Sequence, residues 1–258
     1  MTSRVSAITI NTFREAVRDR VLYNLIVFAL LLVASAPLFG AISIDIEHLV
    51  LVNVGLSSIS LFGVIIAILV GIGLVSKEIE KRTLYTILSR PVRRWEFIVG
   101  KYFGLLLTLV VNAALMTLGF YLALLATEQK LTHSDAGLLV AIYFIVLEIV
   151  MMTAIALLFS SFSTPVFAAI FSFALFIIGT FGDDLRNVAA SSNGVMRWFT
   201  TAAAYLAPNF SSLNVISQVA HDKPIGGSLV LFNTLYAVLY SAAVTAAAVL
   251  IFNRRNLK

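Results

Sequence analysis

Long apolar stretches alternate with short polar ones along most of the chain. Six of the apolar stretches are continuous and close to or above the roughly 20 residues that a helix needs to cross a membrane. None shows the apolar–polar alternation that marks a transmembrane β-strand. The pattern predicts an all-α integral membrane protein, with six transmembrane helices in a single membrane domain over residues 1–258. The predicted spans are Val21–Ile44, Leu49–Ser76, Tyr102–Thr127, Ala136–Ser160, Pro165–Gly182 and Ser228–Phe252.

Three further segments are amphipathic. Residues 1–20 mix apolar and charged side chains at helical spacing, which favours an N-terminal interfacial helix over a simple basic flank. Residues 77–100 carry an apolar stripe among charges, and Pro91 ends the short cytoplasmic helix that the stripe predicts. Such a helix either lies on the membrane or inserts into a groove of a soluble partner, and the pattern alone leaves both open. Residues 183–227 predict an amphipathic external helical cap before the sixth span.

The composition agrees with a lipid environment. Hydrophobic residues make up 60% of the chain and charged residues only 12%, whereas a soluble domain has about 45–50% apolar residues. The chain has no cysteine, which excludes disulfides and cysteine metal sites. Because so little of the chain is left for a soluble domain, we expect another chain to supply energy. We attribute the net charge of +5 to basic residues that set the membrane topology. We therefore expect no nucleic acid partner.

Basic residues are distributed unequally between the two sides of the predicted membrane. Residues 1–20, 77–101 and 254–258 together hold fourteen, against four elsewhere. The positive-inside rule therefore places both termini in the cytoplasm, which an even number of spans requires, and predicts a multi-pass protein of the cytoplasmic (inner) membrane. Pro37, directly after Ala34-Ser35-Ala36, favours an uncleaved first span over a signal peptide.

One carboxyl group falls inside a predicted span. Glu148 lies in the middle of the fourth span, where a charge costs about 2.5–3.5 kcal/mol on insertion scales. It either lines a translocation path, serves as a protonatable switch, or ties two helices together, with Asn112 as one possible partner. A proton site would make the protein a secondary transporter, which is the alternative function.

Catalytic and cofactor motifs are missing from the sequence. The Gly100-Lys101 pair lacks the upstream glycine of a phosphate-binding loop, and it is followed by Tyr102 rather than serine or threonine. The three histidines stand singly outside the spans, with no metal-binding spacing. We therefore expect no enzyme activity, no metal and no cofactor bound by this chain.

Several short motifs lie in the predicted cytoplasmic parts and one lies in the predicted external connection. The cytoplasmic motifs are Glu78 with Glu80, Thr83-Leu84, Leu88-Ser89-Arg90-Pro91-Val92, Arg94, Gly100-Lys101 and the turn Phe159–Pro165, and the external one is Tyr205–Phe210. Together they resemble the motifs of ABC exporter permeases of the second type, the ABC-2 superfamily, and the likeness is closest to the branch described as multicopper-enzyme-maturation permeases. Arg82 stands where that family often has glycine.

The resemblance implies a mechanism. A separate ABC ATPase subunit would bind ATP and Mg, and it would dock on the cytoplasmic coupling helix after the second span. A second permease copy, as homodimer or heterodimer, would complete an export path. External helices before the sixth span would dip into the outer leaflet and gate the exit. The implied ATPase-coupling residues are Glu78, Glu80, Arg82, Thr83, Leu84, Ile87 and Leu88, with Ser160 and Ser161 from the second cytoplasmic turn.

Overall fold

The structure, a computed structural model, describes residues 2–42, 47–80, 93–128, 135–191, 194–221 and 223–254. These residues form helices joined by short turns, without any strand. The helices are α1 (Thr2–Val17), α2 (Arg20–Ile42), α3 (Glu47–Glu80), α5 (Arg94–Glu128), α6 (Asp135–Phe162), α7 (Pro165–Thr180), α8 (Gly182–Ser191), α9 (Val195–Leu206), η1 (Ser211–Leu213), α10 (Ile216–Ala220) and α11 (Gly227–Arg254).

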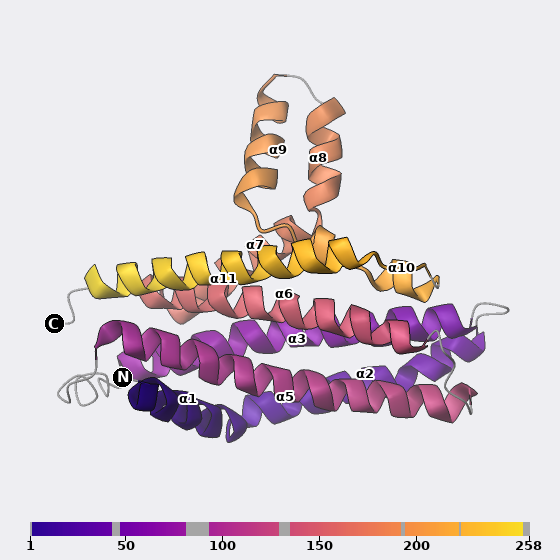
Figure 1. The fold of residues 1–258 in the computed structure, drawn as a ribbon, viewed down its shortest axis with the longest axis horizontal. Helices are drawn as coiled ribbons and strands as arrows, with labels where there is room; N and C mark the ends of the chain where they lie inside the picture. Colours follow the sequence, from indigo (N-terminus) through magenta and orange to yellow (C-terminus); the bar gives the residue numbers. More distant parts are fainter. Residues whose placement is uncertain are drawn as a thin grey trace.

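Each predicted span coincides with one helix of a bundle (Figure 1). In the described part of the chain, α3, α5, α6 and α11 are long and apolar enough to cross a membrane. A fifth candidate combines α7 and α8 across a bend of 63°. The first predicted span forms α2, in which a shorter apolar helix covers Leu22–Ser35. Length and composition thus support four or five spans, and the sixth depends on α2.

The core of the bundle lies around α3 and α6. About 72% of the most apolar window of each is buried, whereas the corresponding fractions are 33% for α5 and 28% for α11. Figure 1 shows α3 and α6 running between α5 and α11. Helices α3 and α6 meet other helices on most sides, which explains why their sequences are apolar on every face. The outer two helices present apolar side chains outward, as lipid-facing helices do.

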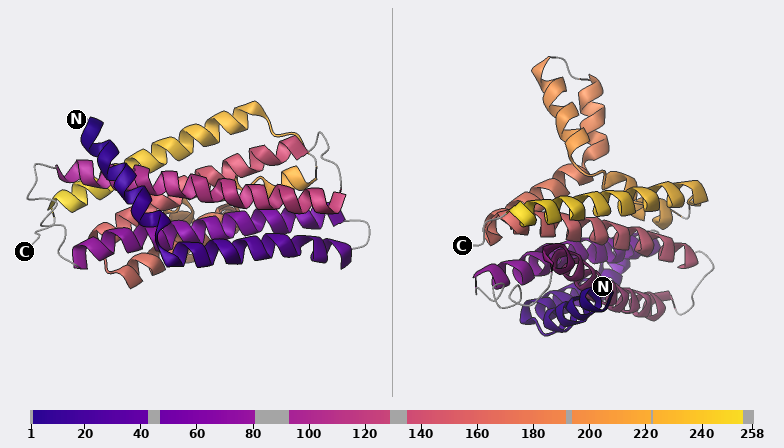
Figure 2. Two further views of the ribbon diagram at one scale, coloured as in Figure 1. Left: turned by 90° about the horizontal axis from the view of Figure 1, so that it is seen from below. Right: turned by 60° about the vertical axis from the view of Figure 1, so that its left-hand side comes forward.

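The expected N-terminal amphipathic helix forms and packs against α5. Gly100 and Gly104 lie one turn apart on α5, and a Cβ at Gly104 would come within 2.5 Å of the Thr12 Cβ. The Thr9 hydroxyl donates a hydrogen bond to the Gly100 carbonyl over 3.3 Å. Two glycines at this spacing let helix backbones approach closely. As a result α1 crosses the other helices obliquely at the end of the bundle where α5 begins (Figure 2).

The predicted external connection contains a helical hairpin. Helices α8 and α9 pack on each other and stand away from the bundle (Figures 1 and 2). The chain then returns through η1 and α10 to α11, and the Asn233 amide donates to the Ser212 carbonyl over 2.7 Å. Several apolar side chains of α9 are exposed, including Trp198 at 69% and Phe199 at 60%. The hairpin is therefore amphipathic, as the sequence predicts for this cap.

Candidate functional site

The predicted coupling segment begins on α3 and ends at α5. Helix α3 continues to Glu80, so Glu78 and Glu80 belong to its last turn rather than to a separate short helix. The 34 residues of α3 span about 50 Å, well beyond a hydrocarbon core of about 30 Å. The helix therefore projects past the membrane. The other predicted coupling residues of this segment, Arg82, Thr83, Leu84, Ile87 and Leu88, lie outside the described residues.

The exit from the segment is fixed by contacts at the start of α5. The buried Glu96 carboxylate accepts a hydrogen bond from the Arg93 backbone N–H over 2.9 Å, which caps the helix. The Arg94 guanidinium donates to the Asn253 carbonyl over 2.9 Å and reaches the Phe252 carbonyl at 3.4 Å. A cation at these carbonyls suits the negative end of α11. The first turn of α5 is thus held against the last turn of α11.

An ion pair between a buried lysine and a partly exposed glutamate connects the same end of α5 to α1. The Lys101 Nζ lies 3.2 Å from the Glu15 carboxylate, and the Lys101 side chain is only 2% exposed. The ammonium also lies 5.8 Å from the centre of the Phe97 ring. A buried ammonium needs such partners because desolvation disfavours its charge. Residue spacing alone does not reveal this pair, although Gly100 and Gly104 on either side of Lys101 are a signal for close helix packing.

The predicted second cytoplasmic turn lies between α6 and α7. Ser160 and Ser161 are buried, and their hydroxyls donate to the Leu157 and Leu158 carbonyls over 3.0 and 2.6 Å. Phe162, by contrast, is 47% exposed. The two predicted contact residues are therefore buried within the bundle, and the exposed surface of the turn is formed by Phe162 and Thr164.

Glu148 ties α6 to α3. Its carboxylate accepts a hydrogen bond from the Ser60 hydroxyl over 2.7 Å, and Glu148 is buried. The partner suggested by sequence was Asn112, but the buried Asn112 side-chain N–H has no hydrogen-bond partner among the described residues. Sequence reasoning missed Ser60, because a serine within an apolar span is common and carries little signal by itself.

The described residues contain no group of three or more His, Cys, Asp or Glu side chains arranged to hold a metal ion. Some polar groups of the bundle connect two helices, as Ser60 does with Glu148 and Lys101 with Glu15, while others bond within their own helix. The resulting arrangement is one of long apolar helices, with charged contacts among α1, α5 and α11 at one end of the bundle. It defines a class, that of multi-pass α-helical membrane proteins.

Within that class, comparison with protein families is decisive. The chain belongs to the ABC-2 family of transporters, because the family described as "ABC-2 family transporter protein" matches residues 6–257. No curated protein sequence gives a significant match. Family members are membrane components of ABC transporters, typically without catalytic activity, and they generally work with an ATPase subunit. The superfamily inferred from the sequence motifs is confirmed, and the multicopper-enzyme branch stays a prediction.

Proposed function

We propose that this chain is the membrane-spanning subunit of an ATP-driven exporter in a cytoplasmic (inner) membrane. The family match over residues 6–257 carries the proposal. In the proposed topology α2, α3, α5, α6, the α7–α8 pair and α11 cross the membrane, and both termini are cytoplasmic. The excess of basic residues in the N-terminal segment, in residues 77–101 and in the C-terminal tail supports this orientation. The alternative of a secondary transporter gains no support from the family.

The ATPase subunit docks on residues 77–100 in this proposal. Leu84, Ile87 and Leu88 supply the apolar contact, while Glu78, Glu80, Arg82 and Thr83 supply the polar rim. The fixed start of α5 supports this assignment. Arg94 holds that start against α11 and Lys101 holds it against α1, so a push on the segment reaches several helices at once. ATP and Mg are bound by the partner and not by this chain.

The second cytoplasmic turn forms a smaller contact with the same ATPase. Because Ser160 and Ser161 are buried and bonded within α6, they shape the turn rather than touch the partner. The exposed Phe162 ring makes the contact. A second permease copy, identical or related, completes the export path. Within the superfamily we assign the chain to the multicopper-enzyme-maturation branch.

The docking proposal is tested by placing a charge on the apolar stripe. We expect Leu84→Asp and Ile87→Asp to reduce co-purification of the ATPase subunit from native membranes at least tenfold. A buried, unpaired carboxylate costs more than the 1.4 kcal/mol that a tenfold loss of affinity represents. The measurement is ATP hydrolysis and mass spectrometry of the affinity-purified complex.

The matched control is Thr86→Asp, which adds the same charge to the opposite face of the short helix that the sequence predicts. We expect this variant to retain the ATPase subunit. Wild-type levels of co-purification with both stripe variants would refute docking at this segment, while leaving the family assignment intact.

A further inference from the structure

The inner face of α1 is covered by α5 rather than by lipid. On that face Thr12 is completely buried, and it packs against Gly104 of α5. The opposite face is exposed and carries Ile10 and Arg14, with Arg18 following in the turn after the helix. An interfacial helix ordinarily inserts its apolar face between lipids, but here that face is occupied by protein. Contact of α1 with a membrane therefore depends mainly on its arginines.

The junction of α1 and α2 carries a surplus of positive charge. Glu15 is paired with Lys101, which leaves Asp19 as the carboxylate of this stretch that can offset three arginines. All three arginines are exposed, and among the described residues their guanidinium groups have no ion-pair or hydrogen-bond partner. The α1–α2 junction is therefore suited to binding an anion, since guanidinium groups bind phosphate strongly. The arginines are Arg14 in the last turn of α1, Arg18 in the turn that follows and Arg20 at the start of α2.

One exposed face of α2 changes from charged to apolar along its length. Asn24 follows Arg20 by one turn, or about 6 Å, and Val27 follows it by about 10 Å. A phospholipid presents the same order of chemistry along its length, with the phosphate first, then the ester carbonyls and then the acyl chains. Neither a soluble anion nor an acidic protein surface would match the apolar part of this face. The exposed residues that form the face are Arg20, Tyr23, Asn24, Val27 and Leu31.

The α1–α2 junction lies at the edge of the hydrocarbon core. The apolar helix Leu22–Ser35 begins two residues after Arg20. Gly119 of α5 packs on Leu30, and Arg20 precedes Leu30 by about 15 Å along α2, which runs beside α5 (Figure 1). Arg20 is therefore level with a point about 20 Å from the start of α5 at Arg94, well away from that end of the bundle. The arginines thus lie at the depth of lipid headgroups, in the cytoplasmic leaflet of the topology proposed above.

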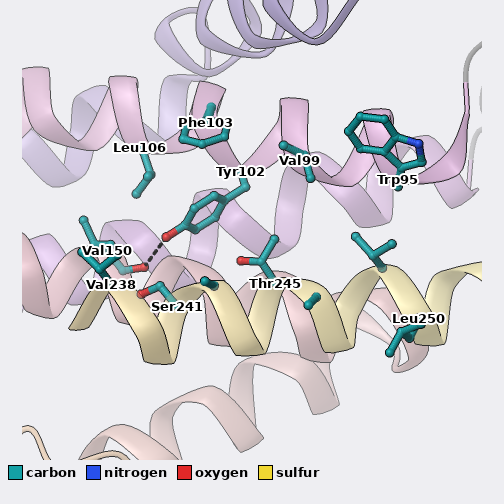
Figure 3. Close-up of a pocket in the computed structure, with 13 residues that line it drawn as sticks. Trp95, Val99, Tyr102, Phe103, Leu106, Val150, Val238, Ser241, Thr245 and Leu250 are labelled. Carbon is teal, nitrogen blue, oxygen red and sulfur yellow. Dashed lines mark hydrogen bonds between the residues drawn. The ribbon is translucent and has the colours of Figure 1, made fainter. Parts of the chain in front are cut away.

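The groove between α5 and α11 provides a comparison. It has a volume of about 700 Å³ and is lined by uncharged side chains, among them Trp95, Phe103 and Leu250 (Figure 3). A lipid in that groove would be held through its acyl chain, so the groove offers no means of distinguishing one headgroup from another. Selectivity for an anionic headgroup is therefore expected at the α1–α2 junction and not at the groove.

We propose that the α1–α2 junction is a binding site for an anionic phospholipid. The three arginines contact the headgroup phosphate. The Tyr23 hydroxyl and the Asn24 amide donate to the ester oxygens, and an acyl chain follows Val27 along α2. A zwitterionic headgroup brings its own ammonium group close to the arginines and is bound less tightly. The site requires only that the chain lies in a membrane, and its assignment to the cytoplasmic leaflet rests on the proposed function and its topology.

The test measures lipid binding to the purified full chain in detergent by native mass spectrometry. The chain is titrated with phosphatidylglycerol, or with phosphatidylcholine that carries the same acyl chains. We expect the first phosphatidylglycerol to bind at least 25-fold more tightly than the first phosphatidylcholine. The variant Arg18→Gln with Arg20→Gln should weaken phosphatidylglycerol binding about 25-fold, because each arginine contributes about fivefold, which corresponds to about 1 kcal/mol. Arg18→Lys with Arg20→Lys, which keeps both charges, should retain the preference.

The matched control is Arg197→Gln with Arg254→Gln, which removes the same number of charges from exposed positions on α9 and at the end of α11. We expect this variant to bind phosphatidylglycerol as the wild type does. Equal affinity of the wild type for the two lipids, or an equal loss of binding in the control, would overturn the proposal. Loss of the ATPase subunit from the Arg18→Gln, Arg20→Gln protein with unchanged lipid preference would assign the arginines to the partner protein instead. None of these lipid measurements depends on ATPase docking at residues 77–100, so failure of the site leaves the proposed function standing.

Discussion

Two buried ionisable side chains are each matched by a partner on another helix. Lys101 of α5 pairs with Glu15 of α1, and Glu148 of α6 accepts a hydrogen bond from Ser60 of α3. Glu148 lies within an apolar span, where no water is available to replace a missing partner. The buried Lys101 ammonium lies near the end of the bundle, where desolvation disfavours its charge unless it is paired. Each group therefore fixes the relative position of the two helices that it joins. Both contacts are therefore explained by helix assembly before any transport role is considered.

Two substitutions of Glu148 distinguish a structural role from a role in protonation, and we expect the structural one. Glu148→Gln keeps an oxygen that accepts from the Ser60 hydroxyl, so stability and ATP-driven turnover should stay close to wild type. Glu148→Leu removes the acceptor and should lower the free energy of unfolding by about 1 kcal/mol or more. Thermal unfolding in detergent and ATP turnover of the reconstituted complex provide the measurements.

The matching control is the double variant Glu148→Leu with Ser60→Ala, in which neither partner remains. It should recover part of the stability lost in Glu148→Leu, because the two residues interact directly and their effects are not additive. A Glu148→Gln protein that unfolds normally but has lost turnover would instead identify the carboxyl group as a protonation or path residue.

The sequence predicts that Glu148 needs a partner, but it does not predict which one. Hydropathy places Ser60 and Asn112 on neighbouring spans at similar depths, and both can hydrogen-bond. The choice depends on how α3 and α5 are rotated about their axes relative to α6. That rotation is set by packing of many apolar side chains, such as the contact of Gly63 with Ile149, and not by any local signal.

At the scale of elements, the contact of α1 with α5 joins the N-terminal helix to the end of the bundle that we propose couples to the ATPase. Gly100 and Gly104 create a shallow face on α5 into which Ile8 and Thr12 fit. Interfacial helices usually float on the membrane surface through their apolar face alone. Here the glycines and the Lys101–Glu15 pair attach the helix to the bundle, so α1 is expected to move together with α5.

We expect Gly104→Ala to loosen this attachment. Its Cβ would lie 2.5 Å from the Thr12 Cβ and 2.7 Å from the Thr9 carbonyl oxygen, so the helices must separate. Overpacking of this kind costs about 1–3 kcal/mol. The measurements are the unfolding temperature in detergent and the rate at which protease cleaves α1.

Gly73→Ala is the comparison, because a Cβ at Gly73 meets nothing within 4 Å. Alanine favours a helix interior over glycine by up to about 1 kcal/mol, so this variant should be as stable as the wild type or more so. Equal loss of stability in the two variants would contradict the specific packing of α1 on α5.

The helices themselves are the part of the fold that the sequence predicts best. Each long apolar stretch corresponds to one helix. Such a stretch lies in lipid, where no water is available to the backbone, and a helix satisfies all of the backbone hydrogen bonds within the segment. The bend after α7 is not predicted. The stretch Pro165–Gly182 is apolar throughout, yet α7 ends at Thr180, where Pro208 and Phe210 pack against Gly179. That contact comes from residues nearly thirty positions later, which local hydropathy cannot represent.

At the scale of the whole molecule, the bundle separates two kinds of surface. One end gathers α1, the start of α5 and the end of α11 through Arg94, Lys101 and their partners. The α8–α9 hairpin leaves the bundle elsewhere, beyond α7 (Figure 1). Because the buried α3 and α6 connect these regions, a movement imposed at the proposed coupling end would be transmitted to the far part of the bundle.

The topology depends on whether α7 and α8 together cross the membrane, and the absence of cysteine allows a direct measurement. Helix α7 has 16 residues, about 24 Å, which is short of a core of about 30 Å, so α8 or a local thinning must complete the crossing. Single cysteines at two exposed positions, Thr164→Cys before α7 and Lys223→Cys after the hairpin, should then lie on opposite sides. We expect a membrane-impermeant maleimide to label Lys223→Cys in intact cells at least tenfold more than Thr164→Cys. Permeabilised cells should remove the difference. Equal labelling in intact cells would place both positions on one side and make α7–α8 a re-entrant hairpin, and the reverse order would invert the proposed orientation.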